Sequence, residues 1–452
     1  MPDTLTLDSF DGLRQREFSR LDEQGIAYLD YAAAGLHSAS QARAYAERLC
    51  AGVYGNPHSE HGPSRASERD LEAARSATLA FFDADPDVYE VCFTANTSAA
   101  IKLVAESYAF SPRRGLLLSA DNHNSVNGMR EYAHRAEAPV GVLPLDSELR
   151  LEEPASHLRE FAKSTRDGLF AFPVQSNFSG VRHPLDLVAE AKALGLEVLI
   201  DAAGCCLSGD ISLRRHPADF LAFSYYKLFG LPTGVGALIA RRDALERLNR
   251  PWFAGGTVDF VSVAHDRHQL TRGHAGFEDG TPNFLSAGAI LDGFDFISKH
   301  DAGGLRERLR RLTSLFITEA QALAYPDGSP LVRLYGPANM VQRGGTVAFN
   351  ILRPNGETLP YWQVEYAARD AGVAIRGGCF CNPGAAERAF DFARHDVAAC
   401  LNALGGGFTI PKLQQRLGPT ATVGALRLSI GAPTVKGDIE RAIAVLASSA
   451  AA

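Results

Sequence analysis

One lysine and one aspartate stand at the ends of apolar runs, where charged side chains are uncommon. Lys227 follows the apolar part of LAFSYYKLFG (221–230), and Asp201 ends the apolar part of EVLIDAAG (197–204). In a parallel α/β sheet, ligands bind at the edge formed by the carboxyl ends of the strands. The two residues could form a structural ion pair, but a buried ion pair is weak evidence for stability. The alternative is that the amine and the carboxylate are kept for chemistry.

The segment FTANTSAAIKLVA (93–105) has the pattern of a strand, a small polar turn and a helix. Thr97 could serve only as the N-cap of this helix. The turn also offers backbone N–H groups and the hydroxyls of Thr97 and Ser98 to a phosphate. Pyridoxal 5'-phosphate requires a lysine amine for a Schiff base and a carboxylate beside its pyridine nitrogen. Together with Asp201 and Lys227, the turn therefore predicts pyridoxal 5'-phosphate as the cofactor.

The composition describes an ordinary globular protein of 452 residues, of which 46% are hydrophobic and 21% are charged. A net charge of −7 gives no electrostatic reason to expect nucleic acid as a partner. No apolar run is long enough to span a membrane, and the N-terminus lacks the regions of a secretory signal. Seven cysteines in a chain of this length do not make a disulfide framework. We therefore expect a cytoplasmic protein that binds neither membrane nor nucleic acid.

Short apolar runs alternate with helical patterns between about residues 90 and 241. The strand-like runs cover residues 90–95, 115–120, 168–175, 197–204, 219–226 and 234–240, and helical periodicity covers 98–110 and 185–195. Runs that are apolar on both faces and separated by helices predict a mostly parallel sheet covered on both sides.

Beyond this region the pattern changes. A charged helical stretch covers residues 303–324, sparser strand-like runs cover 345–352, 372–377 and 424–431, and a closing helix covers about 437–449. This predicts a smaller α+β domain. The predicted fold class is thus α/β, with an N-terminal segment (1–27), a large domain (28–295) and a small C-terminal domain (296–452).

Eight motifs follow one another along the chain: YLDYAAAG (28–35), YGNPHS (54–59), FTANTSAAIKLVA (93–105), DAAG (201–204), SYYKLFGLPTGVGAL (224–238), FAGGTV (253–258), EDGTPNFL (278–285) and RGGCFCNPGA (376–385). In this order they resemble the class V aminotransferase-fold enzymes, which are pyridoxal-phosphate-dependent transferases of fold type I. The chain is most similar to the cysteine desulfurases, and within them to the desulfurase domain of molybdenum cofactor sulfurases. The resemblance runs from about residue 27 to residue 435, and SYYKLFGLPTG and RGGCFCNPGA are its specific motifs.

The resemblance implies roles for individual residues. Lys227 would form the Schiff base, Asp201 would hold the pyridine nitrogen, and His123 would stack on the cofactor ring. The phosphate would be held by Thr97, Ser98 and Ser224, with Thr281 reaching the phosphate of the neighbouring subunit. Asn177 would bond the phenolic oxygen or lie near the substrate, and Arg427 would take the substrate carboxylate, for which a planar bidentate donor is suited. The role of Thr281 implies a homodimer with composite sites.

The loop GGCFCNPG contains Cys379 and Cys381 in the composition of a mobile or tightly turned loop. The resemblance aligns Cys381 with the nucleophile that takes sulfur as a persulfide, and Cys379 is a neighbour that could resolve or relay it. Arg376 could supply positive charge to a thiolate or serve the substrate carboxylate. A metal interpretation of the two cysteines is weak, because no second Cys/His pair at ligand spacing accompanies them. We predict no metal.

Three features depart from the family pattern. Tyr226 precedes the lysine where most desulfurases have His, as it does in the sulfurases, so a phenol would contact the cofactor. Gly204 stands where many desulfurases place Gln, which removes one bond to the phenolic oxygen. Sulfurases continue into a second domain that handles the molybdenum cofactor, whereas this chain ends at Ala452. The final sulfur acceptor therefore stays open.

The predicted function is a pyridoxal-phosphate-dependent cysteine desulfurase, in which L-cysteine or a cysteine-like amino acid loses sulfur to Cys381. A sulfur-acceptor protein is then a candidate partner. The same scaffold also supports C–S lyases, aminotransferases and epimerases, but the two cysteines of the loop favour the desulfurase. A non-catalytic scaffold is disfavoured because Lys227, Asp201, His123 and Arg427 are all retained.

Overall fold

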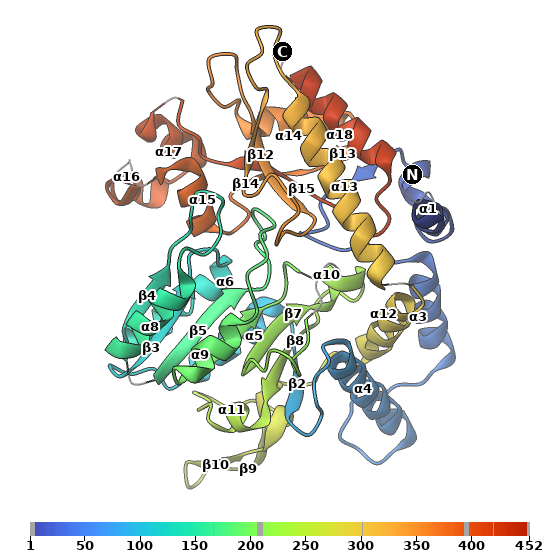
Figure 1. Ribbon diagram of the computed structural model, residues 1–452. Coiled ribbons are helices and arrows are strands. Elements are labelled where there is room, and N and C mark those ends of the chain that lie inside the picture. Colours follow the sequence, from blue (N-terminus) through green and yellow to red (C-terminus); the bar gives the residue numbers. More distant parts are fainter. Residues whose placement is uncertain are drawn as a thin grey trace.

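The computed structural model describes residues 5–165, 167–205, 211–300, 302–392, 397–418 and 420–449, and it contains a large and a small sheet flanked by helices (Figure 1). Within these residues the larger sheet has seven strands. In spatial order they are β2 (Tyr89–Thr94), β8 (Gly236–Arg241), β7 (Phe220–Ser224), β6 (Leu196–Asp201), β5 (Asp167–Pro173), β3 (Arg114–Ser119) and β4 (Val140–Leu143). The α/β fold class predicted from the sequence is thus confirmed.

The larger sheet is mostly parallel, with β8 antiparallel to both of its neighbours. Its strands are buried on both faces: Phe170 and Phe172 of β5 pack into one core cluster, whereas Leu169 and Ala171 pack into another. This explains why the runs are apolar throughout rather than alternating. Each of the six predicted runs contains a strand. β4, an edge strand whose Val142 is 55% exposed, was not predicted from the sequence, because its apolar run VGVL has only four residues and lies between Pro139 and Pro144.

Helices cover both faces of the larger sheet and connect its strands. Those between residues 39 and 298 are α3 (Ala39–Ala51), α4 (Gly62–Phe81), α5 (Thr97–Ser107), α6 (Asn124–Asn127), α7 (Arg130–Arg135), α8 (Pro154–Ser164), α9 (Leu187–Ala193), α10 (Tyr225–Phe229), α11 (Arg242–Glu246) and α12 (Ala287–Ser298). α5 packs on β7 and β8, and α9 packs on β6. Gly195 follows α9 with a left-handed φ of 83°, in keeping with its predicted capping role.

The smaller sheet has the order β11 (Val332–Tyr335), β12 (Thr346–Ile351), β15 (Ala425–Ser429) and β14 (Arg376–Gly378). The other helices are α1 (Leu5–Glu17), α2 (Arg20–Glu23), α13 (Ala302–Ala322), α14 (Tyr361–Asp370), α15 (Pro383–Phe390), α16 (Val397–Leu404), α17 (Ile410–Leu417) and α18 (Lys436–Ser449). The run predicted at 372–377 forms two short strands, because β13 (Val373–Ala374) pairs with β1 (Ala27–Tyr28) while β14 pairs with β15. The predicted domain boundary at 295–296 falls within α12 and stays a prediction.

The arrangement places the carboxyl ends of the central strands opposite the smaller sheet. Figure 1 shows α6, which follows β3, and α10, which follows β7, at the edge of the larger sheet that faces β14 and β15. The hairpin of β9 (Val258–Ser262) and β10 (Arg267–Leu270) extends from the opposite end of the molecule. Any ligand at the carboxyl edge therefore lies between the two sheets.

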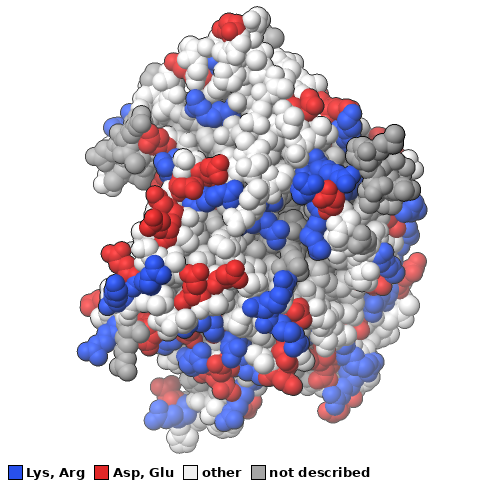
Figure 2. Space-filling view, in the orientation of Figure 1, with Lys and Arg blue, Asp and Glu red and all other residues white. Residues whose placement is uncertain are grey.

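The surface carries charges of both signs. On the face seen in Figure 2, Lys and Arg side chains are interspersed with Asp and Glu. None of the helices in the described part of the chain has the length and apolar character needed to cross a membrane.

Gly230 ends α10, three residues after Lys227, and its backbone requires glycine. Its φ is 77°, and a Cβ at this position would lie 2.2 Å from the backbone nitrogen of His37. We predict that Gly230→Ala lowers the free energy of unfolding by about 1–3 kcal/mol, because it combines left-handed strain with a backbone clash. Urea denaturation measures the change. Gly437→Ala, in α18 with open space around it, is the matched control and should be neutral or stabilising.

Candidate active site

A cavity of about 370 Å³ opens where β6 and β7 end. It is lined by eight of the residues that the sequence singles out: Thr97, Ser98, His123, Asn177, Asp201, Ser224, Tyr226 and Lys227. They come from segments spread over more than a hundred residues of the chain, from Thr97 to Lys227. The parallel topology brings them together because each ends or follows a strand of the same sheet.

Hydroxyl groups gather at the N-terminus of α5. Asn96, not Thr97, is the N-cap, because its side chain accepts a hydrogen bond from the N–H of Ala99 (3.0 Å). Thr97 instead donates its N–H to Ser224 Oγ (2.8 Å), and the two hydroxyls lie 2.6 Å apart. The Ser98 hydroxyl lies 2.6 Å from that of Ser125. Hydroxyls at a helix N-terminus suit a phosphate, and the interpretation of Thr97 as only an N-cap is wrong.

Asp201 is a buried carboxylate at the end of β6, with 5% of its surface exposed. It accepts a hydrogen bond from the N–H of Ala203 (2.9 Å). Burial raises the pKa of Asp201, against the opposing effects of that hydrogen bond and of the charges of Lys227 and His123. Among the described residues no side-chain cation forms an ion pair with it. A ligand with a cationic ring nitrogen would supply the missing partner, so this donor set fits pyridoxal 5'-phosphate.

His123 follows β3 and caps the short helix α6. Its Nδ1 accepts a hydrogen bond from the N–H of Ser125 (3.1 Å), which places the ring proton on Nε2. Burial lowers the pKa of His123, against the opposing effect of the Asp201 charge and together with the positive charges of Lys227 and Arg427. The ring is therefore neutral at neutral pH, a state that suits stacking on a flat ligand.

Gly204, which stands where many desulfurases place Gln, is required for a steric reason. A Cβ at this position would lie 2.6 Å from the backbone oxygen of Gln175, so a larger residue does not fit. The Gln175 side chain lies beside it and donates Nε2–H to the Gly204 carbonyl (2.9 Å). Gln175 also lines the cavity. An amide is thus present at this side of the cavity, supplied from a position that the sequence did not single out.

The loop that carries Cys381 is tied to the His123 turn. The N–H of Asn124 donates to the Cys381 carbonyl (2.7 Å), and the Asn177 side chain donates to the Phe380 carbonyl (2.6 Å). Phe380 and Cys381 have φ values of 56° and 55°, a left-handed backbone that is rare for residues with a Cβ. The backbone is thus tightly turned here, one of the two properties that the sequence predicts for this loop, and its mobility stays a prediction.

A second set of hydrogen bonds, made by the buried Asn382 side chain, also holds the cysteine loop. Asn382 is fully buried, and its Nδ2 donates to Asp121 Oδ1 (2.7 Å) and to Asn177 Oδ1 (3.0 Å). Its Oδ1 accepts from the N–H of Ala385 and so caps α15. These bonds tie the residue next to Cys381 to the segments that form the cavity wall.

The two thiols of the loop differ in their surroundings. Cys381 is exposed, whereas Cys379 is partly buried with its thiol 3.5 Å from the Val423 carbonyl. Burial, helped by Cys381 and Glu387, raises the pKa of Cys379 to about 11. Cys379 is therefore a protonated thiol at neutral pH. Within the described ranges, no group of three or more His, Cys, Asp or Glu side chains is placed to hold a metal ion.

Arg427 and Arg376 lie on neighbouring strands beside the loop. Arg427 is 3% exposed and donates Nη1–H to the Asn177 carbonyl (2.9 Å), which connects it to the cavity wall. Both arginines form ion pairs with Asp30, at 3.0 Å for Arg427 and 2.9 Å for Arg376. The sequence did not predict this shared carboxylate.

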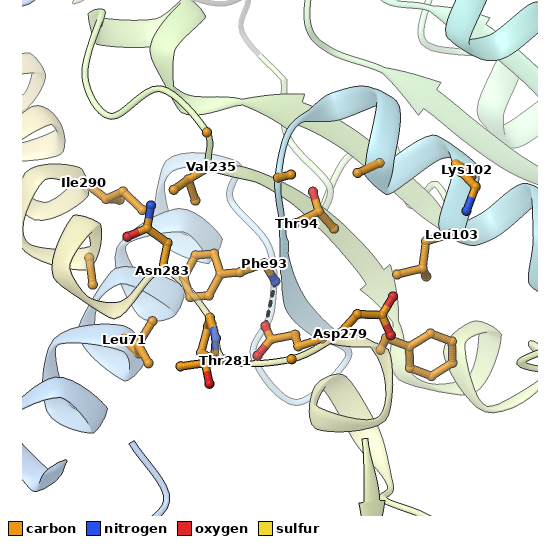
Figure 3. A pocket seen from close by; sticks show the side chains of 18 of the residues that line it. Leu71, Phe93, Thr94, Lys102, Leu103, Val235, Asp279, Thr281, Asn283 and Ile290 are labelled. Atoms are coloured by element: carbon orange, nitrogen blue, oxygen red, sulfur yellow. Dashed lines mark hydrogen bonds between the residues drawn. The ribbon is translucent and has the colours of Figure 1, made fainter. Parts of the chain in front are cut away.

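Thr281 does not reach the cavity of Lys227 within its own chain. It lines a separate pocket of about 340 Å³, across from Val235 (Figure 3). Arg75 positions this segment by pairing with Glu278 (2.6 Å), whose carboxylate also accepts the Phe93 N–H drawn in Figure 3. The predicted contact of Thr281 with a neighbouring subunit stays a prediction.

Four residues near the site carry no motif of their own: Asp30, Asp121, Gln175 and Asn382. Asp30 and Asn382 lie inside motifs of the family resemblance, and Asp121 and Gln175 lie just after strands. Only these positions in the sequence could have pointed to them. Their importance follows from partners that are distant in sequence, and these partners cannot be read from a pattern.

Comparison with known proteins gives consistent results. Residues 27–441 match the family model of aminotransferase class-V. Molybdenum cofactor sulfurase of Arabidopsis thaliana is 34% identical over 436 residues, which cover 86% of this chain and 52% of that protein. The chain thus spans about half the length of the curated relatives it matches.

Solved structures share the fold across the whole chain. A cysteine desulfurase from Thermococcus onnurineus superposes with a TM-score of 0.79 at 23% identity, covering 97% of both chains. The cystine C-S lyase C-DES, in complex with cysteine persulfide, superposes with a TM-score of 0.70 at 16% identity, covering 93% of this chain and 97% of that one. At these identities the likeness shows the fold.

We predict that Asn382→Ala loosens the Cys381 loop. The change removes the amide that bonds Asp121 and Asn177, and leaving a buried carboxylate with one donor fewer costs about 1–3 kcal/mol. Amide hydrogen exchange over residues 376–390 should accelerate, while exchange in β5 and β6 stays unchanged. Gln41→Ala, which removes another buried amide bonded to the Leu231 carbonyl, is the control. Unchanged exchange in the loop would show that Asn382 does not hold it.

Proposed function

The chain belongs to the aminotransferase class-V family, and we propose that it is a pyridoxal-phosphate-dependent enzyme that removes sulfur from L-cysteine or a cysteine-like amino acid. Sulfur passes to Cys381 as a persulfide, and the rest of the substrate leaves as alanine. The observation that carries this proposal is the 2.7 Å hydrogen bond from the Asn124 N–H to the Cys381 carbonyl. It joins the loop with the exposed thiol to the His123 turn on the cavity wall.

The residues around the cavity have the chemistry to hold pyridoxal 5'-phosphate. Lys227 would bind it covalently, Asp201 would pair with its ring nitrogen and His123 would stack on the ring. The hydroxyls of Thr97, Ser98 and Ser224 would hold the phosphate, with the Tyr226 phenol and Asn177 amide alongside. When bound, the cofactor supplies an electron sink that stabilises negative charge at the substrate Cα. Lys227 is the one amine among the residues lining this cavity, and it would move a proton at that carbon.

The sulfur transfer balances without an external oxidant. The Cys381 thiolate attacks the substrate sulfur, and a sulfur–sulfur bond forms as the substrate carbon–sulfur bond breaks. The electron pair of the broken bond stays with carbon, which takes up a proton, so that alanine results. The sulfur atom on Cys381 is oxidised to the persulfide level while carbon is reduced. Cys379, protonated and held against Val423, is the less suitable nucleophile.

Arg427 is proposed to bind the substrate carboxylate. Its guanidinium lies against Asn177, a residue of the cavity wall, and its buried Nε has no hydrogen-bond partner among the residues that the structure describes. An unpaired buried donor is costly, and a carboxylate oxygen would satisfy it.

Partners follow from the same site. We infer a homodimer in which Thr281 serves the site of the other subunit, supported by its exposed position and its separation from Lys227 in one chain. A sulfur acceptor, small molecule or protein, must remove the persulfide for a second turnover. A free nucleophilic thiol suits a reducing compartment, so the cytoplasm stays the predicted location.

The proposal is tested by incubating purified protein with L-cysteine and a reductant and by measuring alanine and sulfide together. Equal amounts of both are expected. Sulfide with pyruvate in place of alanine would contradict a desulfurase and would favour a C–S lyase.

Lys227 is predicted to carry the cofactor. Borohydride reduction of the yellow holoenzyme should fix pyridoxal phosphate to the peptide that contains Lys227, as detected by mass spectrometry. Lys227→Ala should lose this linkage, because no other lysine lines the cavity. Lys192→Ala, whose amine pairs with Asp219 outside the cavity, is the control and should keep it. A covalent adduct that persists in Lys227→Ala would refute the assignment.

Cys381 is predicted to accept the sulfur. Brief exposure to L-cysteine should add the mass of one sulfur atom to the peptide containing Cys381. Cys381→Ala should still shift the cofactor absorbance on binding L-cysteine, yet release alanine at least about a hundredfold more slowly, as expected when a nucleophile is removed. Cys379→Ala should be affected less. If alanine release survives in the double variant Cys379→Ala/Cys381→Ala, the persulfide mechanism is eliminated.

A further inference from the structure

Two arginines face each other across a strand pair beside the cavity. Arg376 of β14 and Arg427 of β15 are direct partners in the antiparallel register. Like charges directly opposite each other destabilise a sheet. Asp30 lies between them: its Oδ1 accepts from Arg427 Nη2 (3.0 Å), and its Oδ2 accepts from Arg376 Nε (3.0 Å) and Nη2 (2.9 Å). Each carboxylate oxygen therefore serves one arginine.

Asp30 is held in place by the backbone on either side of it. The segment that follows β1 runs beside the end of β15, where the Ser429 N–H donates to the Leu29 carbonyl (2.7 Å) and the Ala32 N–H donates to Ser429 Oγ (2.8 Å). Asp30 itself forms a parallel bridge with Ser429 and is 9% exposed. Its carboxylate is thus fixed relative to both arginines.

The two arginines are held in different states. The Arg427 side chain is 3% exposed, and its guanidinium carbon lies 4.8 Å from the centre of the Phe380 ring. Burial lowers the pKa of Arg427, and its Nε has no hydrogen-bond partner within the described part of the chain. The Arg376 side chain is 51% exposed, and the hydrogen bond to Asp30 raises its pKa. A buried donor stays available on Arg427, while Arg376 is turned outward.

We propose that Asp30 is a positioning residue that sets the net charge around Arg427, the proposed binding group for the substrate carboxylate. Arg376, Arg427 and Asp30 together carry one net positive charge. This charge balances the single carboxylate of an amino acid whose side chain is uncharged. This inference rests on the proposed function, in which Arg427 binds the substrate carboxylate. It adds that Asp30 selects against substrates with a second negative charge, because their extra carboxylate would meet that of Asp30.

The test measures binding of two small probes, acetate and malonate, to the holoenzyme by isothermal titration calorimetry. Removing the Asp30 charge leaves two positive charges, so Asp30→Asn should raise the affinity for malonate over that for acetate by about tenfold. Asp30→Glu, which keeps the charge, should retain the wild-type ratio. Added salt should reduce the gain, as for any charge effect near solvent. Asp438→Asn breaks another buried aspartate–arginine pair, with Arg14 (2.8 Å), and is the control for a stability effect alone.

The outcomes separate the possibilities. If the ratio of malonate affinity to acetate affinity is unchanged in Asp30→Asn, even when both probes bind more weakly, the proposal is overturned and Asp30 is a structural residue. If Asp30→Asn does not fold, Arg376→Gln gives the opposite test. Arg427 and Asp30 then have no net charge together, so the affinity for malonate should fall more than the affinity for acetate. Failure of the proposed function is detected separately, by the absence of alanine when the wild type is given L-cysteine.

Discussion

The fully buried carboxylate of Asp121 joins the segments on which the candidate site depends. It accepts hydrogen bonds from Ser176 Oγ (2.7 Å), His183 Nε2 (2.8 Å) and Asn382 Nδ2 (2.7 Å). An isolated buried carboxylate is very costly, so these three donors are held firmly. They come from the turn after β5, from the segment leading to α9 and from the cysteine loop. Since Asp121 precedes His123 by two residues, the same bonds fix the His123 turn relative to that loop.

The electrostatics of the cavity favour a bound cation with a phosphate. Burial raises the pKa of Asp201 and lowers that of His123, so both groups are pushed toward their neutral forms. A positively charged ring nitrogen next to Asp201 would restore its ionised form. The N-terminus of α5, with the Thr97 and Ser224 hydroxyls, supplies the complementary site for negative charge. The protein atoms are thus arranged for a ligand that carries both charges.

The cysteine loop combines a fixed backbone with an exposed thiol. Two consecutive left-handed residues, Phe380 and Cys381, cost about 1–2 kcal/mol each. The hydrogen bonds to both of their carbonyls, from Asn177 and Asn124, offset this strain. The two thiols therefore differ in exposure: the Cys381 side chain is exposed to solvent, whereas the Cys379 side chain packs against Val423. The exposed side of Cys381 is therefore the side on which another molecule can approach its thiol.

The sequence alone determined the α/β class, the strands of the larger sheet except β4, and the residues at the strand ends that line the cavity. Apolar runs, helical periodicity and glycine caps are local signals, and strand ends of one parallel sheet share an edge. Only the tertiary structure decided that Asp121 bonds Asn382, 261 residues away, and that Asp30 pairs with Arg427, 397 residues away. It also decided that Thr281 lies in another pocket. Such contacts depend on how the two sheets pack together, because no local pattern specifies which distant donor meets a buried carboxylate.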